Sequence, residues 1–177
     1  DVGQAEVVEI AAVRVRDGKV VRDFHSLVKP GVPITEGARR AHQIGEQDVA
    51  GAPPFEAVWP AFREFCGSDV IVAHNGHQFD FPILRRMSAA LPGAPLRTYD
   101  TLPLARELHA GSAKLVDLAR VYGVDPGQSH RALDDTRTLA HLFLALGEAK
   151  VARARKTALV NLLDHLGIAL ALSDAES

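Results

Sequence analysis

Two short stretches of the sequence carry the side chains that could do chemistry. In the first, from His74 to Asp80, a carboxylate follows the end of an apolar run by a few residues. In the second, from His130 to Asp135, an imidazole precedes a carboxylate by about one and a half helical turns. Carboxylate oxygens suit hard divalent cations, and an imidazole titrates near neutral pH, so it can take a proton from an attacking water.

Each stretch also has a purely structural interpretation. Asp80 could be the N-cap of the helix that follows it, with Phe79 in the hydrophobic core. The stretch from His130 to Asp135 could be a capped helix start whose charges are solvated. The spacing within each stretch, taken alone, leaves both interpretations open.

The elements that must position these residues alternate between strands and helices. β-Branched and apolar runs predict strands at residues 7–15, 20–28, 69–73 and 97–99. Apolar residues at helical spacing predict helices at residues 35–42, 54–65, 81–91, 101–108, 114–122, 131 to about 146, and 151–172. A hairpin turn is expected at Asp17-Gly18, and Asp100 is expected to cap the helix at 101–108. This order is typical of an α/β fold with a mixed central sheet flanked by helices, and Asp80 follows a strand end, where such folds bind ligands.

Composition excludes several classes of protein. The chain has 177 residues, which favours one domain, and its 47% apolar and 24% charged residues exclude disorder and collagen-like repetition. The net charge of −2 provides no overall positive field to attract nucleic acid, but it is compatible with an enzyme that binds one strand end locally through metal ions. The single cysteine excludes an internal disulfide and a cysteine-based zinc site, and favours a reducing, cytoplasmic location. No apolar run is long enough to cross a membrane.

Taken together, the two stretches resemble a known family. Asn75-x3-Phe79-Asp80, followed about fifty residues later by His130-x4-Asp135, resembles the second and third motifs of the DEDDh 3′–5′ exonucleases. These are the DnaQ-like and RNase T-like enzymes, including the exonuclease domain of the DNA polymerase III epsilon type. Shorter agreements lie at residues 8–13, 33–34, 41–44 and 100–106. The resemblance covers about residues 4–147.

This resemblance implies a ribonuclease H-like fold and a metal-dependent hydrolase. Asp80 and Asp135 would be catalytic carboxylates that bind two divalent ions, Mg²⁺ or Mn²⁺, in the complete protein, and His130 would be the general base. Phosphodiester bonds would be cut from the 3′ end of single-stranded DNA, with RNA as another substrate, and nucleoside 5′-monophosphates would be released. The positions expected to contact the substrate are Asn75, Phe79 and His74.

One motif of the family is not found. The family carries Asp-x-Glu on its first strand, just upstream of the pattern at residues 8–13, and residues 1–6 contain no such motif. Neither Glu6 nor Glu9 is expected to replace it; Glu9 lies within a strand, at a position that is not a ligand in the family. Asp80 and Asp135 alone would set two negative charges against the four positive charges of two ions. We therefore expect a sequence truncated at its N-terminus, and a domain that folds poorly without this central strand.

The predicted domains are an exonuclease domain at residues 1–148 and a C-terminal helical extension or linker at residues 149–177. Expected partners are 3′ ends of single-stranded DNA or RNA and a DNA polymerase or fused downstream domain; no membrane is expected, and a homodimer is compatible with the family. Proofreading, DNA repair and RNA processing all stay open as roles. Two alternatives also stay open: a catalytically inactive domain that binds nucleic acid or assembles proteins, and an unrelated α/β protein.

Overall fold

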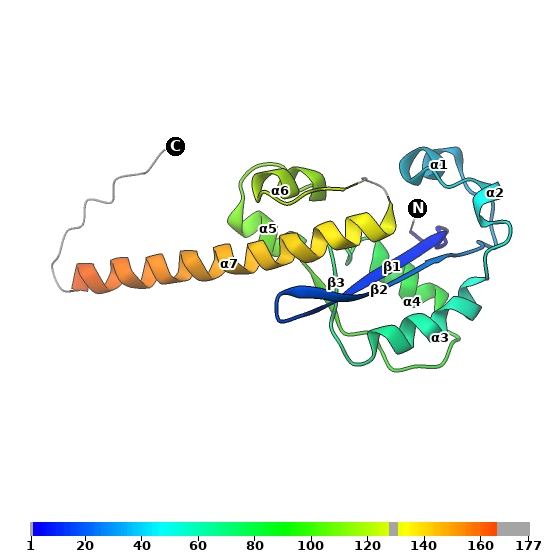
Figure 1. The fold of residues 1–177 in the computed structure, drawn as a ribbon, viewed down its shortest axis with the longest axis horizontal. Coiled ribbons are helices and arrows are strands. Elements are labelled where there is room, and N and C mark those ends of the chain that lie inside the picture. The colour runs from blue at the N-terminus through cyan, green and yellow to red at the C-terminus, as the bar shows by residue number, and fades with distance from the viewer. Residues whose placement is uncertain (1, 128–130, 166–177) are drawn as a thin grey trace.

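The computed structural model describes residues 2–127 and 131–165. Its strands are β1 (Glu9–Arg16), β2 (Lys19–Leu27), β3 (Ile71–Ala73) and β4 (Thr98–Asp100). Its helices are α1 (Glu36–His42), α2 (Glu46–Val49), α3 (Phe55–Cys66), α4 (Asp80–Met87), α5 (Leu102–Leu108), α6 (Leu115–Val121) and α7 (Ala132–His165). Figure 1 shows β1, β2 and β3 between α3 and α7, and the element order is the α/β order that the sequence predicts.

β1 and β2 form the predicted antiparallel hairpin, with Glu9 opposite Leu27 at its open end. The turn residues Asp17 and Gly18 both have positive φ angles, 51° and 72°. Two positive φ angles define the turn type whose twist matches that of the flanking strands, and glycine adopts the second angle without strain. The hairpin predicted from Asp17-Gly18 is therefore confirmed.

β3 and β4 form a second pair, which is parallel, with Ala73 opposite Asp100 at the last position. Parallel pairing brings the carboxyl ends of both strands to the same edge, so the loops that follow Ala73 and Asp100 lie side by side. The sequence predicts one mixed sheet, whereas the described residues form two separate two-stranded sheets. The observed sheets differ from the predicted one because, within the described residues, no hydrogen-bonded pairing joins the β1–β2 hairpin to β3.

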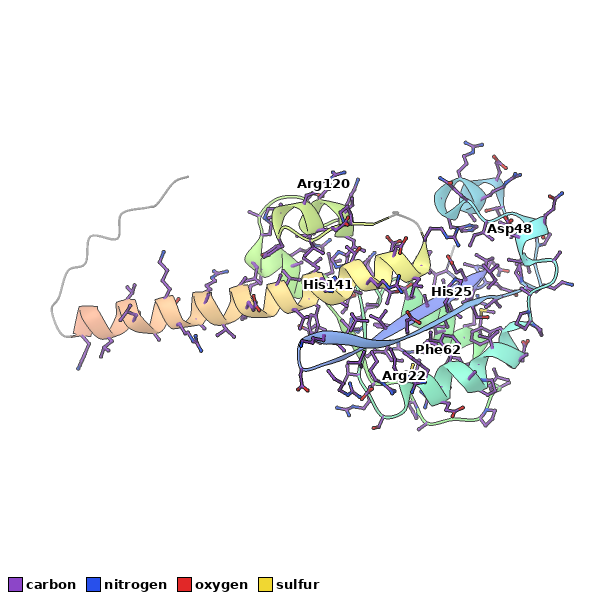
Figure 2. The ribbon with its side chains drawn as sticks, viewed as in Figure 1. Arg22, His25, Asp48, Phe62, Arg120 and His141 are labelled. Carbon is purple, nitrogen blue, oxygen red and sulfur yellow. The ribbon has the colours of Figure 1, made fainter. Side chains whose placement is uncertain are left out.

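The main hydrophobic core lies between the hairpin and α3. Phe24 of β2 contacts Phe62 of α3 edge to face, with ring centroids 5.7 Å apart, and Figure 2 labels Phe62 there. Val28 and Phe55 are almost fully buried in the same cluster. Replacement of a buried phenylalanine such as Phe62 by alanine typically costs about 3–5 kcal/mol of unfolding free energy, so this core holds α3 firmly against the hairpin.

α7 is one continuous helix where the sequence predicts two, ending at about residue 146 and starting at 151. Its first half packs on β1, α5 and α6, with Leu142 and Leu146 fully buried. The predicted break is wrong because Gly147 is tolerated: glycine weakens a helix by only about 1 kcal/mol, and Lys150 pairs with Glu107 of α5 just beyond it. The predicted domain boundary between residues 148 and 149 falls inside this helix.

Beyond α5 and α6 the second half of α7 projects away from the rest of the fold (Figure 1). Val151, Leu159 and Leu162 are exposed along it. Across the residues that the structure describes, no helix is both long enough and apolar enough to cross a membrane.

Candidate active site

The loop at residues 74–79 joins the carboxyl end of β3 to α4 and carries the first chemical cluster. Asn75 has a left-handed backbone with φ of 61°, a conformation that asparagine tolerates better than most residues. Gly76 is tightly enclosed: a Cβ atom there would lie 2.5 Å from the Cβ of Ala73 and 2.8 Å from the ring of Phe81. The loop therefore needs glycine at this position for space, and its shape is closely fixed.

Asp100, the last residue of β4, holds this loop from the neighbouring strand. Its Oδ1 accepts hydrogen bonds from the backbone N–H groups of Asn75 and Leu102, both at 2.9 Å, and its Oδ2 accepts one from His77 at 3.0 Å. Burial alone would raise the pKa of Asp100, but these N–H donors together hold it below its usual value. The N-cap position of α5 belongs to Thr101, so the predicted N-cap at Asp100 is off by one residue, although Asp100 does accept the N–H of the first helical residue, Leu102. The two bonds to the loop were not predicted.

Asp80 is the first residue of α4 and is exposed to solvent. The N-cap position belongs to Phe79, so the alternative in which Asp80 caps α4 is wrong. Partial desolvation by the surrounding protein raises the pKa of Asp80; its own backbone N–H lowers it, and the negative charge of Asp100 raises it further. A carboxylate in such a field gains from a nearby cation, and carboxylate oxygen is the donor that hard divalent cations prefer.

His74 is held inside the fold by both ring nitrogens. Its Nδ1 lies 2.8 Å from the hydroxyl of Thr101, and its Nε2 lies 2.6 Å from the backbone carbonyl of Ala113. Because a carbonyl only accepts, Nε2 carries the proton and donates it. A substrate contact through either nitrogen of His74 would require one of these two bonds to break.

The other two predicted substrate contacts, Asn75 and Phe79, lie in the same loop. Phe79 is 54% exposed immediately before Asp80, and an exposed aromatic ring can stack on a nucleic-acid base. The Oδ1 atom of Asn75 is buried and has no hydrogen-bond partner in the part of the chain that the structure describes. The structure thus brings His74, Asn75, Phe79 and Asp80 together on one short segment.

The second cluster lies at the start of α7. Asp135 is partly buried in the first turn of this helix, whereas His130 lies outside the described residues. Glu9 of β1 holds the helix start: its Oε2 accepts the backbone N–H of Ala132 at 3.1 Å, and its Oε1 lies 2.7 Å from Nε2 of His25 (labelled in Figure 2). Arg131 lies 3.6 Å from the same Oε1.

Sequence reasoning considered Glu9 only as a substitute metal ligand and Asp100 only as a helix cap. A signal for Asp100 was present, since an acidic residue directly follows a predicted strand. No comparable signal marks Glu9, because its partner lies 123 residues away.

Asp80 and Asp135 belong to different helices, α4 and α7. Within residues 2–127 and 131–165, no group of three or more His, Cys, Asp or Glu side chains forms a cluster that could hold a metal ion. The two carboxylates match divalent cations in donor type, but they supply only two protein ligands, so substrate phosphate and water would have to complete the coordination.

Comparisons with known proteins agree on one family. A family model described as "Exonuclease" (RNase_T) matches residues 1–143. The chain is 34% identical over 152 residues to the DNA polymerase III subunit epsilon of Aquifex aeolicus, covering 84% of the chain and 75% of that protein. It is 34% identical over 166 residues to the PolC-type DNA polymerase III of Thermotoga petrophila, covering 91% of the chain but only 12% of the polymerase.

The solved structures show the same relationship. Exonuclease X, in complex with 5′-overhanging duplex DNA, superimposes with a TM-score of 0.68 at 36% sequence identity, covering 81% of this chain and 83% of that one. This agreement confirms the ribonuclease H-like exonuclease fold that the sequence implied. Because the family match extends over most of the chain and a 34%-identical relative is matched over three quarters of its own length, the chain belongs to the RNase T exonuclease family and is a DnaQ-like 3′–5′ exonuclease domain.

Proposed function

We propose that this domain is a metal-dependent 3′–5′ exonuclease that removes nucleoside 5′-monophosphates from the 3′ end of single-stranded DNA. The observation that carries the proposal is the placement of Asp80, in a chain of this family, at the carboxyl edge of the β3–β4 pair. The fixed loop at residues 74–79 presents Asp80 at that edge, and the negative charge of Asp100 favours a cation there.

Exonucleases of this family generally use divalent metal ions, and Asp80 and Asp135 are the described carboxylates that would hold Mg²⁺ or Mn²⁺. Two such ions, when bound, stabilise the attacking and leaving oxygens of the phosphodiester and lower the pKa of a water molecule. His130 would take the proton of the attacking water, a role that imidazoles suit because an unperturbed imidazole titrates near neutral pH.

The loop before α4 would orient the substrate. The exposed ring of Phe79 offers a stacking surface for the base at the 3′ end, next to the carboxylate of Asp80. Asn75 would contact the terminal nucleotide from the same loop. His74 would act indirectly, by holding the loop in place, because both of its ring nitrogens are engaged by Thr101 and Ala113.

The relatives suggest the setting in which the domain works. The chain spans 12% of the PolC-type polymerase and 75% of the epsilon subunit. The activity and partners of the whole protein are therefore proposals drawn from these relatives. We propose a DNA polymerase, separate or fused, as the partner, which makes proofreading the role tested first. A homodimer is the other assembly to test. A cytoplasmic location is proposed from the single cysteine.

The test is a cleavage assay on the full-length protein with 5′-labelled single-stranded DNA and with RNA of the same sequence. We expect stepwise shortening from the 3′ end that stops with a chelator and returns with added Mn²⁺. Asp135→Asn is expected to lower the rate more than about 100-fold, since removal of a metal ligand should exceed the effect of removing its supporting residues.

Asp23→Asn is the matched control, because Asp23 is exposed on β2 and, within the described residues, forms a salt bridge with Arg137 on the surface. Unfolding temperature and DNA binding are measured for both variants. If Asp135→Asn keeps the activity of Asp23→Asn, the proposed metal-dependent mechanism is wrong. If the unsubstituted protein binds DNA but cleaves neither substrate with added metal, the inactive binding domain is the better description.

A further inference from the structure

We propose that Asp100 is a positioning residue for the reaction: its carboxylate holds the loop at residues 74–79 in the shape that presents Asp80. The inference rests on the proposed function, because it assumes that Asp80 acts at the reaction centre. Asp100 itself would touch neither substrate nor metal. It acts through the backbone of the loop.

The geometry of the loop supports this role. The backbone N–H groups of Asn75 and His77 lie on either side of Gly76 and both point at the carboxylate of Asp100, at 2.9 and 3.0 Å. With Asn75 in the left-handed conformation, these N–H groups line a concave backbone segment of the kind that binds anions. Here the anion is a side chain of the same protein, which is only 7% exposed and is therefore fixed by its surroundings.

A carboxylate suits this position better than a neutral side chain. Hydrogen bonds to a charged acceptor are stronger than those between neutral groups. Asp100 accepts three backbone N–H bonds with two oxygens. An asparagine amide has one accepting oxygen, so its NH₂ group would face at least one backbone N–H with no acceptor between them.

The shape of the loop is passed on to Asp80 through the backbone. The carbonyl of Gly76 accepts the N–H of Phe81 at 2.8 Å, and the carbonyl of Asn75 accepts the N–H of Gln78 at 3.2 Å. Phe81 is almost fully buried, so the start of α4 has little freedom to move independently. Asp80 lies between these anchored residues, and a shift of the loop therefore shifts its carboxylate.

Catalysis is sensitive to shifts of this size. A displacement of about 1 Å in a catalytic group can cost about 100-fold in rate, and loss of a residue that orients a metal ligand typically costs about 10–100-fold in metal affinity or activity. Loss of the Asp100 carboxylate should therefore appear mainly as weaker metal binding and slower turnover.

The experiment compares Asp100→Asn with Asp69→Asn in the full-length protein. Asp69 precedes the opposite end of β3 and pairs with Arg14 and Arg16, so its substitution controls for loss of a structural carboxylate near the same strand. Three quantities are measured: the Mn²⁺ concentration for half-maximal cleavage, Mn²⁺ binding without DNA by electron paramagnetic resonance, and amide hydrogen exchange at Asn75 and His77.

For Asp100→Asn we expect the Mn²⁺ concentrations for half-maximal cleavage and for half-maximal Mn²⁺ binding without DNA to rise at least about tenfold. We also expect faster amide exchange at Asn75 and His77. Asp69→Asn should leave all three readouts unchanged, even if its unfolding temperature falls. A folded Asp100→Asn protein that matches Asp69→Asn in these readouts overturns the inference. Should Asp100→Asn fail to fold, the unsubstituted protein decides: rapid exchange at Asn75 and His77 overturns the inference, and strong protection supports it.

Asp80→Asn separates this inference from the proposed function. If Asp80→Asn is inactive while Asp100→Asn behaves like the Asp69→Asn control, only the positioning role of Asp100 is wrong. If Asp80→Asn keeps full activity, the proposed function itself is wrong, and the role of Asp100 falls with it.

Discussion

The carboxylate of Glu9 on β1 accepts a hydrogen bond from the backbone N–H of Ala132, the first residue of α7, at 3.1 Å. The first N–H groups of a helix have no partner within the helix, and an acidic side chain near them is stabilising. Glu9 is also bonded to His25, and only 6% of its side chain is exposed. One buried carboxylate thus joins both strands of the hairpin to the helix that carries Asp135.

The first prediction concerns this contact. Glu9→Ala leaves the N–H of Ala132 and the ring of His25 without their acceptor, so we expect a loss of about 1–3 kcal/mol in the free energy of unfolding. Activity should fall as well, because the start of α7 and Asp135 lose their anchor. Glu56→Ala is the matched control, because Glu56 also lies in the first turn of a helix, α3, but is exposed; it should cost at most about 1 kcal/mol, the typical helix-dipole contribution of an exposed acidic residue. Urea unfolding measures both, and equal midpoints would contradict the role of Glu9.

The second prediction concerns the space around Gly76. Gly76→Ala places a Cβ atom 2.5 Å from the Cβ of Ala73, and neither atom can rotate away, so we expect a loss of about 1–3 kcal/mol in stability. Cleavage should slow more than stability alone explains, because α4 and Asp80 must shift. Gly37→Ala is the matched control: Gly37 lies in α1 with open space around it, and alanine there should stabilise by about 0.5–1 kcal/mol. Thermal unfolding and activity of the two variants test the prediction, which fails if both respond alike.

The hairpin and the α/β order could be predicted because their signals are local. Asp17-Gly18 defines a turn by itself, and Asp80 could be placed at a strand end from the few residues before it. The role of Asp100 could not be predicted, because it depends on the parallel pairing that brings Ala73 beside it. Glu9 and Ala132 meet only through the packing of α7 on β1, which no short-range pattern encodes.

The third prediction is a pH dependence that originates at Cys66. Burial in the core raises the pKa of the Cys66 thiol to about 11 from the ordinary value of 9.0, although Arg63 and Arg14 partly oppose this rise. Between these values the unfolded chain loses its thiol proton while the folded chain keeps it. The contribution of Cys66 to stability is therefore fully present below pH 9 and is lost as the pH rises toward 11, with a slope of up to about 1.4 kcal/mol per pH unit.

Other groups also titrate in this range, so the measurement is a difference between two proteins. Urea unfolding of the unsubstituted protein and of Cys66→Ala is compared from pH 8 to about pH 10.5. The stability advantage of the unsubstituted protein should be constant below pH 9 and shrink above it. A constant advantage across the whole range would show that the thiol ionises alike in the folded and unfolded chains.

The last prediction tests the continuity of α7. Because Gly147 lies within a single helix and has open space around it, Gly147→Ala should stabilise the protein by about 0.5–1 kcal/mol. Gly147→Pro should cost about 3 kcal/mol or more, since proline removes a helical hydrogen bond and clashes with the preceding turn. If residues 132–146 and 151–165 were separate helices, proline would be tolerated between them. Gly123→Ala is the control for alanine, because Gly123 has a φ of 67° and alanine there should destabilise by about 1 kcal/mol. Thermal unfolding of the three variants therefore distinguishes one helix from two, and a proline variant as stable as the unsubstituted protein would place the end of the domain at Gly147.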